Sequence, residues 1–152
     1  MGSLIEIWVA DAARGPMRAL DEIECVPGRG LVGDRYFLET GTFSPTARKP
    51  SQEVTLVEVE EVDGFNARHD TRFEPSAFRR NLVTRGVRLN ELVGQRFAIG
   101  SVVLEGIRLC EPCTHLVTFT QAEVLDGLVH RAGLRAAIVR GGTINVGDVV
   151  SV

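Results

Sequence analysis

The chain has 152 residues, about the length of one domain, and its 44% hydrophobic content suffices for one packed core. The net charge of -3 and the pI near 5.6 argue against a general nucleic-acid binder, because phosphate-backbone binding needs a basic surface. A small anionic ligand remains compatible with this charge, since it needs only a few well-placed arginines. The sequence has no long apolar run and no secretory leader, which predicts a cytoplasmic protein without membrane contact.

The first half of the chain combines strands, a long loop and a helix. Residues rich in β-branched and aromatic side chains predict strands over Leu4 to Val9, Ala19 to Cys25 and Glu53 to Val57. Glycines and prolines make residues 28–50 mostly loop. The stretch from Glu58 to Arg68 predicts a helix, because Val59, Val62 and Phe65 recur on one face at helical spacing.

The second half returns to strands. Pro75 begins a turn that leads into the segment Phe78 to Val83, and a short helix is expected within 117–128. Further strands are predicted over Arg96 to Ile99, Ser101 to Leu109, Leu134 to Val139 and Val149 to Val152. In the strand that ends at Leu109, Val103, Ile107 and Leu109 are expected on one face and Arg108 on the other. Gly141-Gly142 predicts a hairpin turn.

These elements predict a mostly β fold with a few short helices, in a closed or nearly closed β-barrel. A parallel doubly wound sheet would need a helix between most strands, and the pattern lacks them. Without a linker or repeat, residues 1–152 are expected to form a single domain.

The segment Gly28 to Gly33 satisfies the letters of the G-x-G-x-x-G dinucleotide fingerprint. That fingerprint works only where the glycines join a strand to a helix that faces the pyrophosphate. Gly41 and Pro45 follow too soon for an adequate helix, so we interpret the match as accidental. Pyridoxal phosphate is also not expected, because Lys49 is the only lysine and lies in a predicted loop.

Cys110-Glu111-Pro112-Cys113 is a C-x-x-C pattern followed by His115. A structural zinc site needs four ligands, and the fourth would come from distant Cys25, His69 or His130. A redox pair needs its first cysteine at a helix N-terminus, whereas Cys110 closes a strand. The zinc site and the redox pair stay as alternatives beside two further readings: Cys113 is the functional thiol and Cys110 is buried, or both cysteines are small core residues.

Arginines accompany asparagine in Phe78-Arg79-Arg80-Asn81 and aspartate in Asp34-Arg35. Guanidinium groups bind phosphate through paired hydrogen bonds, and an asparagine amide can contact a phosphate or a pterin edge. The alternative is that Arg80 is a solvated surface charge, Asn81 a turn or cap residue, and Asp34-Arg35 an internal ion pair in a tight turn. His69 and His130 are interpreted as surface or capping residues.

The order of these motifs resembles the MOSC domain family (molybdenum cofactor sulfurase C-terminal domain) over roughly Ile5 to Val152. The matching segments are Gly30 to Arg35, Thr46 to Arg48, Val54 to Val57, Phe78 to Val83, Leu89 to Gly94, Arg96 to Gly100, Pro112-Cys113 and Gly142 to Asp148. The R-x-N pattern followed by P-C is the most specific part.

The resemblance implies a barrel-like fold that binds the molybdenum cofactor (molybdopterin). It implies that Cys113 is a molybdenum ligand or carries a persulfide sulfur, and that Arg35, Arg79 and Asn81 hold the pterin. If the protein is an enzyme, the resemblance implies molybdenum-dependent reduction of N-hydroxylated compounds, or sulfur transfer. A non-catalytic sulfur or cofactor carrier that acts with a redox or sulfur-donor partner is the rival.

Two departures from the family are expected. The 152 residues leave no room for the extra N-terminal subdomain of the amidoxime-reducing relatives. The pyridoxal-phosphate domain of the sulfurases is absent as well, in agreement with the lysine argument.

Overall fold

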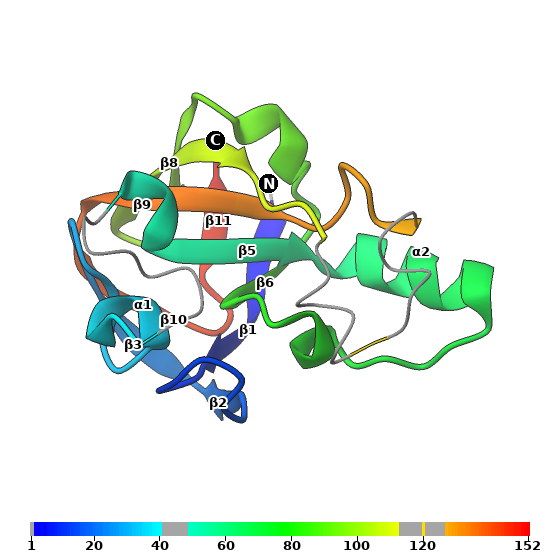
Figure 1. Cartoon of the computed structure of the whole chain (residues 1–152). Coiled ribbons are helices and arrows are strands. Elements are labelled where there is room, and N and C mark those ends of the chain that lie inside the picture. Colours follow the sequence, from blue (N-terminus) through cyan, green and yellow to red (C-terminus); the bar gives the residue numbers. More distant parts are fainter. Residues whose placement is uncertain (1, 41–48, 113–119, 121–126) are drawn as a thin grey trace.

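Strands form most of the protein in this computed structural model, which describes residues 2–40, 49–112, 120 and 127–152 (Figure 1). The strands are β1 (Gly2–Val9), β2 (Arg18–Leu20), β3 (Glu22–Val26), β4 (Gly30–Leu31), β5 (Val54–Glu58), β6 (Leu82–Arg85), β7 (Arg96–Ile99), β8 (Val102–Leu109), β9 (Leu134–Arg140), β10 (Gly142–Asn145) and β11 (Val149–Ser151). The helices of the described residues are α1 (Arg35–Leu38) and α2 (Val59–His69), with 3-10 turns η1 (Pro50–Gln52), η2 (Pro75–Phe78) and η3 (Leu89–Leu92).

Seven strands close into a barrel, which confirms the predicted fold class. Their order is β11-β7-β8-β9-β5-β6-β1, and the pairing of β1 with β11 completes the ring. The pairing Gly2↔Val150 joins these last two strands. β2 extends the sheet beyond β1, and β10, β3 and β4 form a separate three-stranded sheet.

The barrel is mixed because helix α2 connects two of its strands. β5 runs parallel to β6, whereas the other neighbours in the barrel are antiparallel. A parallel pair needs a crossover connection, and α2 supplies it. All five residues of β5 are buried, since the barrel core covers one face and α2 packs near the other.

Helix α2 agrees with its sequence prediction within one residue at each end. Val59, Val62 and Phe65 are its buried residues, as predicted from their spacing. They pack with Val57 and Val83 in a second core outside the barrel. Acidic residues in the first turn and basic residues in the last complement the helix dipole.

Two expectations about the second half are wrong. At the start of β8 the buried residues are Val102 and Leu104, whereas Val103 is half-buried. The alternation of faces changes phase farther along the strand, at a register shift between Gly106 and Arg108. Gly141-Gly142 is not a hairpin turn, since β10 pairs with β3 instead of β9.

A close backbone approach explains the glycine at 141. A Cβ atom there would lie 2.6 Å from the carbonyl oxygen of Cys25. The chain therefore leaves the barrel at this glycine and crosses to the edge of β3. The Ala19 to Cys25 strand is likewise split between β2 and β3, which lie in different sheets.

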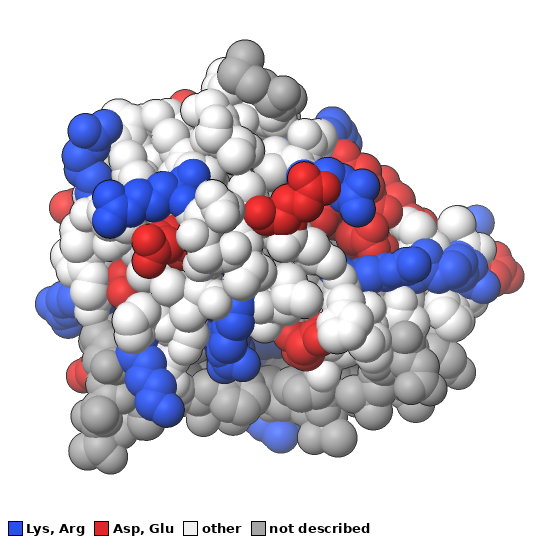
Figure 2. Space-filling model, turned by 90° about the horizontal axis from the view of Figure 1, so that it is seen from above, with Lys and Arg blue, Asp and Glu red and all other residues white. Residues whose placement is uncertain are grey.

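The surface shows no single-sign field on the face in Figure 2, where basic side chains are scattered among acidic and uncharged ones. Among the described residues, no helix has the length and apolar character needed to cross a membrane.

Candidate functional site

Asp34 and Arg35 form a buried ion pair at the start of α1. The Asp34 carboxylate accepts hydrogen bonds from the backbone N–H groups of Ala10 (3.1 Å) and Tyr36 (3.3 Å), and from Nη1 of Arg35 (3.1 Å). The carboxylate thus caps α1 and ties it to the end of β1. The internal ion pair considered from the sequence is present, and it fixes the Arg35 guanidinium.

Helix α1 also explains why the G-x-G-x-x-G match carries no nucleotide site. The helix has four residues, and Asp34 already occupies its N-terminus with a carboxylate. A pyrophosphate would need a longer helix with free N–H groups at that position.

Arg79 lies beside Arg35, although 44 residues separate them in the chain. Arg79 ends η2 in the left-handed conformation (φ 60°), and its carbonyl oxygen accepts a hydrogen bond from Nη2 of Arg35 at 3.0 Å. Its own Nη1 donates to the carbonyl oxygen of Gly15 at 2.7 Å. The structure therefore brings together two of the predicted site residues.

The electrostatics of this pair favour an anion. Burial lowers the pKa of Arg79, and the positive charge of Arg35 lowers it further, while Asp34 opposes the shift. Counted alone, the three buried side chains of Arg35, Arg79 and Asp34 carry a formal charge of +1. A bound anionic group would compensate that charge.

Arg80 is neither a solvated charge nor a phosphate ligand in this structure. Its side chain is buried and donates to three carbonyl oxygens, from Ala132 (2.8 Å), Phe78 (3.1 Å) and Cys110 (3.1 Å). Cys110 and Ala132 flank residues 111–131, so Arg80 holds both ends of that segment against the start of β6. The surface alternative for Arg80 is wrong.

Asn81 is fully buried and bridges β1 and β5. Its Nδ2 donates to the carbonyl oxygen of Trp8 at 3.1 Å. Its Oδ1 accepts from the backbone N–H (3.1 Å) and the hydroxyl (3.2 Å) of Thr55. These contacts give the amide a structural role, and its contact with a pterin stays a prediction.

Cys113 lies outside the described residues, as do His115 and the segment from Thr46 to Arg48. Cys110 is described and buried, as expected for a strand-end packing residue, and its backbone N–H donates to the carbonyl oxygen of Gly133 at 2.7 Å. Cys110 itself lies next to the Arg79–Asn81 segment, because its carbonyl oxygen accepts a hydrogen bond from Arg80.

The other residues considered as zinc ligands have different roles. Cys25 is in the barrel core, and burial raises its pKa to about 12, which disfavours the thiolate that a metal needs. His69 packs on Phe65 with 4.4 Å between ring centroids, and Nδ1 of exposed His130 lies 2.6 Å from the Glu111 carboxylate. Within the described part of the chain, no three His, Cys, Asp or Glu side chains gather as metal ligands.

Sequence reasoning missed Arg135, a buried arginine on β9. Its Nη1 is 3.4 Å from the hydroxyl oxygen of Tyr36 and 3.2 Å from the carbonyl oxygen of Ser51. The Tyr36 ring also lies 4.8 Å from the Arg35 guanidinium carbon, so this ring connects the two arginines. No local motif marks Arg135, because its neighbours come from distant segments.

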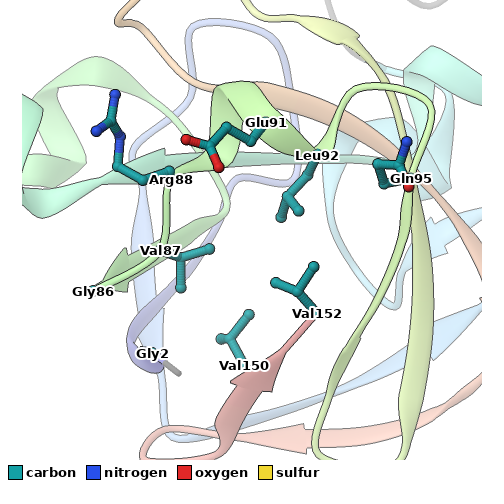
Figure 3. Close-up of a pocket in the computed structure, with 9 residues that line it drawn as sticks. All are labelled: Gly2, Gly86, Val87, Arg88, Glu91, Leu92, Gln95, Val150 and Val152. Carbon is teal, nitrogen blue, oxygen red and sulfur yellow. The ribbon is translucent and has the colours of Figure 1, made fainter.

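A separate pocket of about 330 Å³ lies at the other end of β1 and β6 (Figure 3). It is lined by Gly2, Gly86, Val87, Arg88, Glu91, Leu92, Gln95, Val150 and Val152. The predicted site residues that the structure describes, Arg35, Arg79 and Asn81, do not line this pocket. Arg35 instead contacts Arg79, just before β6, and Asn81 contacts Trp8, near the end of β1.

The sequence of residues 43–151 matches the MOSC domain. The chain belongs to the MOSC domain family. The match covers more than half of the chain, and it spans Arg79, Asn81 and Cys113. Comparison with curated proteins gives no match.

Solved structures share the fold. The YuaD protein from Bacillus subtilis is similar at TM-score 0.81 and 19% identity, over 100% of this chain and 97% of that one. YiiM from Escherichia coli is similar at TM-score 0.72 and 15% identity, over 98% of this chain and 68% of its own. YiiM from Geobacillus stearothermophilus gives TM-score 0.69 and 13% identity, over 99% and 74%.

Membership of the MOSC family supports a cofactor-binding or sulfur-related domain in general. MOSC domains are generally associated with the molybdenum cofactor.

Proposed function

We propose that this MOSC domain binds the molybdenum cofactor, with Arg35 and Arg79 holding its phosphate and Cys113 acting as the metal ligand. The observation that carries the proposal is that two buried arginines, Arg35 and Arg79, lie beside each other and close to Asp34. Keeping two guanidiniums together away from water is costly unless an anion joins them. A phosphate suits them, because each guanidinium presents several N–H donors in one plane.

Asn81 would act on the site by positioning the chain. Its bonds to Trp8 and Thr55 hold the start of β6 between two neighbouring strands. Arg79, two residues earlier, is thereby kept beside Arg35.

Cys113 follows Cys110, whose carbonyl oxygen is bonded to Arg80. This bond holds Cys110 beside Arg80, the residue that follows Arg79. A thiolate is a soft ligand that suits molybdenum. When bound, the cofactor would supply two-electron redox chemistry, for which we propose the reduction of N-hydroxylated compounds.

Metal analysis tests the proposal. The wild-type protein and its variants are produced in a host that makes the cofactor, and bound molybdenum and pterin are measured per chain. We expect Cys113→Ser to lose molybdenum and Arg79→Gln to lose pterin by about tenfold or more, since a charge-assisted hydrogen bond contributes about 1.5–3 kcal/mol. Cys110→Ala is the matched control and should retain both. Equally low metal in wild type and Cys113→Ser would remove the ligand role.

A sulfur carrier acting beside a donor protein is the second candidate. The burial of Cys25 and Cys110 favours it, because neither thiol is available for exchange. In this case the Cys113 thiolate would take the outer sulfur from a cysteine desulfurase persulfide and release the donor's thiolate. Mass spectrometry after incubation with desulfurase and cysteine should show one added sulfur in wild type and none in Cys113→Ser. No added sulfur in wild type would refute this candidate.

A further inference from the structure

Two arginines face each other on the outer surface of β8 and β9. Arg108 pairs directly with Arg135 in the antiparallel register, and paired residues project from the same face of a sheet. The next pair is Leu109↔Leu134, and Leu134 lies in the barrel core. The arginines therefore point outward, where like charges in this arrangement repel each other.

The carboxylates that lie close to Arg108 in the sequence have other partners. Glu105 lies 3.6 Å from Nε of Arg96, and Glu111 is paired with His130. Arg108 is exposed, and within the described ranges it forms no hydrogen bond or ion pair. Neither of these two acids is paired with Arg108.

Arg135 connects this pair to the proposed phosphate site. The Arg135 guanidinium contacts the Tyr36 hydroxyl and the carbonyl oxygen of Ser51. The ring of the same Tyr36 lies beside the Arg35 guanidinium. Arginines therefore follow one another from Arg79 through Arg35 and Arg135 to Arg108. The row ends at solvent, on the strand whose last residue, Leu109, is four positions before Cys113.

We propose that Arg108 and Arg135 bind the oxyanion of an anionic substrate, such as the carboxylate of an N-hydroxylated compound. This inference rests on the proposed function, because it assigns a substrate class to the same site. Arg135 is held in place before the ligand arrives, and exposed Arg108 closes on the anion from solvent. Two guanidiniums clamp one carboxylate through paired hydrogen bonds, which also removes their mutual repulsion.

Kinetics with two probes test the assignment. Cofactor-loaded protein is assayed with benzamidoxime, which is neutral, and with its 4-carboxylate analogue. For Arg108→Gln we expect KM for the carboxylate analogue to rise about five- to tenfold, with kcat and the neutral probe changed by less than about twofold. Arg108→Lys should recover part of the loss, since it keeps the charge without the planar fork.

Arg85→Gln is the matched control, because Arg85 is an exposed arginine at the far end of β6. It should leave both probes unchanged. If Arg108→Gln affects the neutral and the anionic probe equally, or neither of them, the anion subsite is refuted.

Direct binding separates this inference from the proposed reaction. Calorimetric titration of the loaded protein with the 4-carboxylate analogue measures binding without turnover. If neither probe is reduced, the proposed reductase function is rejected, and the titration still tests whether the anion binds. Binding that weakens at least fivefold in Arg108→Gln, and also weakens with added salt, supports the subsite. Absent binding in wild type, or equal binding in both proteins, overturns it.

Discussion

Replacing Arg80 with lysine tests how much the Arg80 side chain contributes to stability by binding the residues at both ends of segment 111–131. Arg80 is 8% exposed, and its guanidinium donates to the carbonyl oxygens of Phe78, Cys110 and Ala132. A lysine ammonium keeps the charge but cannot reproduce this planar fork, so one or two charge-assisted bonds are lost at about 1.5–3 kcal/mol each. We expect the free energy of unfolding to fall by about 2–4 kcal/mol, which lowers Tm by roughly 5–10 °C in a domain of this size.

Thermal and urea unfolding followed by circular dichroism measure the effect. Arg131→Lys is the matched control, because Arg131 is half exposed and its Nε lies 3.7 Å from a Glu61 carboxylate oxygen. An exposed ion pair of this kind contributes at most about 1 kcal/mol. If Arg80→Lys proves no less stable than Arg131→Lys, the three carbonyl contacts do not hold the segment as argued.

Two further predictions concern stability elsewhere. Burial raises the pKa of Glu58, so its contribution to stability is present below the unfolded-state pKa and is lost as pH rises through the raised value. Glu58→Gln can still accept the bond from the Leu89 N–H, so its free energy of unfolding should fall less steeply than that of wild type as pH rises above the usual glutamate pKa of about 4.3. An unchanged pH dependence in urea unfolding would contradict this. Gly133→Ala should lower the free energy of unfolding by at least about 3 kcal/mol, because φ is +117° and a Cβ would overlap the carbonyl oxygen of Leu56. Gly147 has a similar φ of +99° but open space around a Cβ, so Gly147→Ala should lower the free energy of unfolding by only about 1–2 kcal/mol. If thermal unfolding shows the same loss of stability in both variants, the steric argument is rejected.

Local patterns in the sequence were sufficient for most of the barrel strands, for α2 and for the fold class. The apolar spacing of Val59, Val62 and Phe65 predicts α2, because a helix repeats its faces within four residues. Short strands separated by glycines predict a barrel, and the order of motifs predicts the MOSC family. These signals all lie between near neighbours along the chain.

Strand pairing depended on contacts that no local pattern encodes. β10 leaves the barrel to pair with β3, and the register shift before Arg108 reverses the expected face of Val103. Both outcomes depend on which backbone edges become available after the rest of the chain has folded.

The same division applies to the arginines. The R-R-N motif identifies both of its arginines as candidate site residues. It does not tell that Arg79 lies beside Arg35, whereas Arg80 donates to three backbone carbonyl oxygens. Residue type therefore determined that this chain carries arginines, which are suited to phosphate, and one thiol after Pro112. Tertiary structure decided which arginines lie near each other and added Arg135, because burial and charge proximity arise only when distant strands meet.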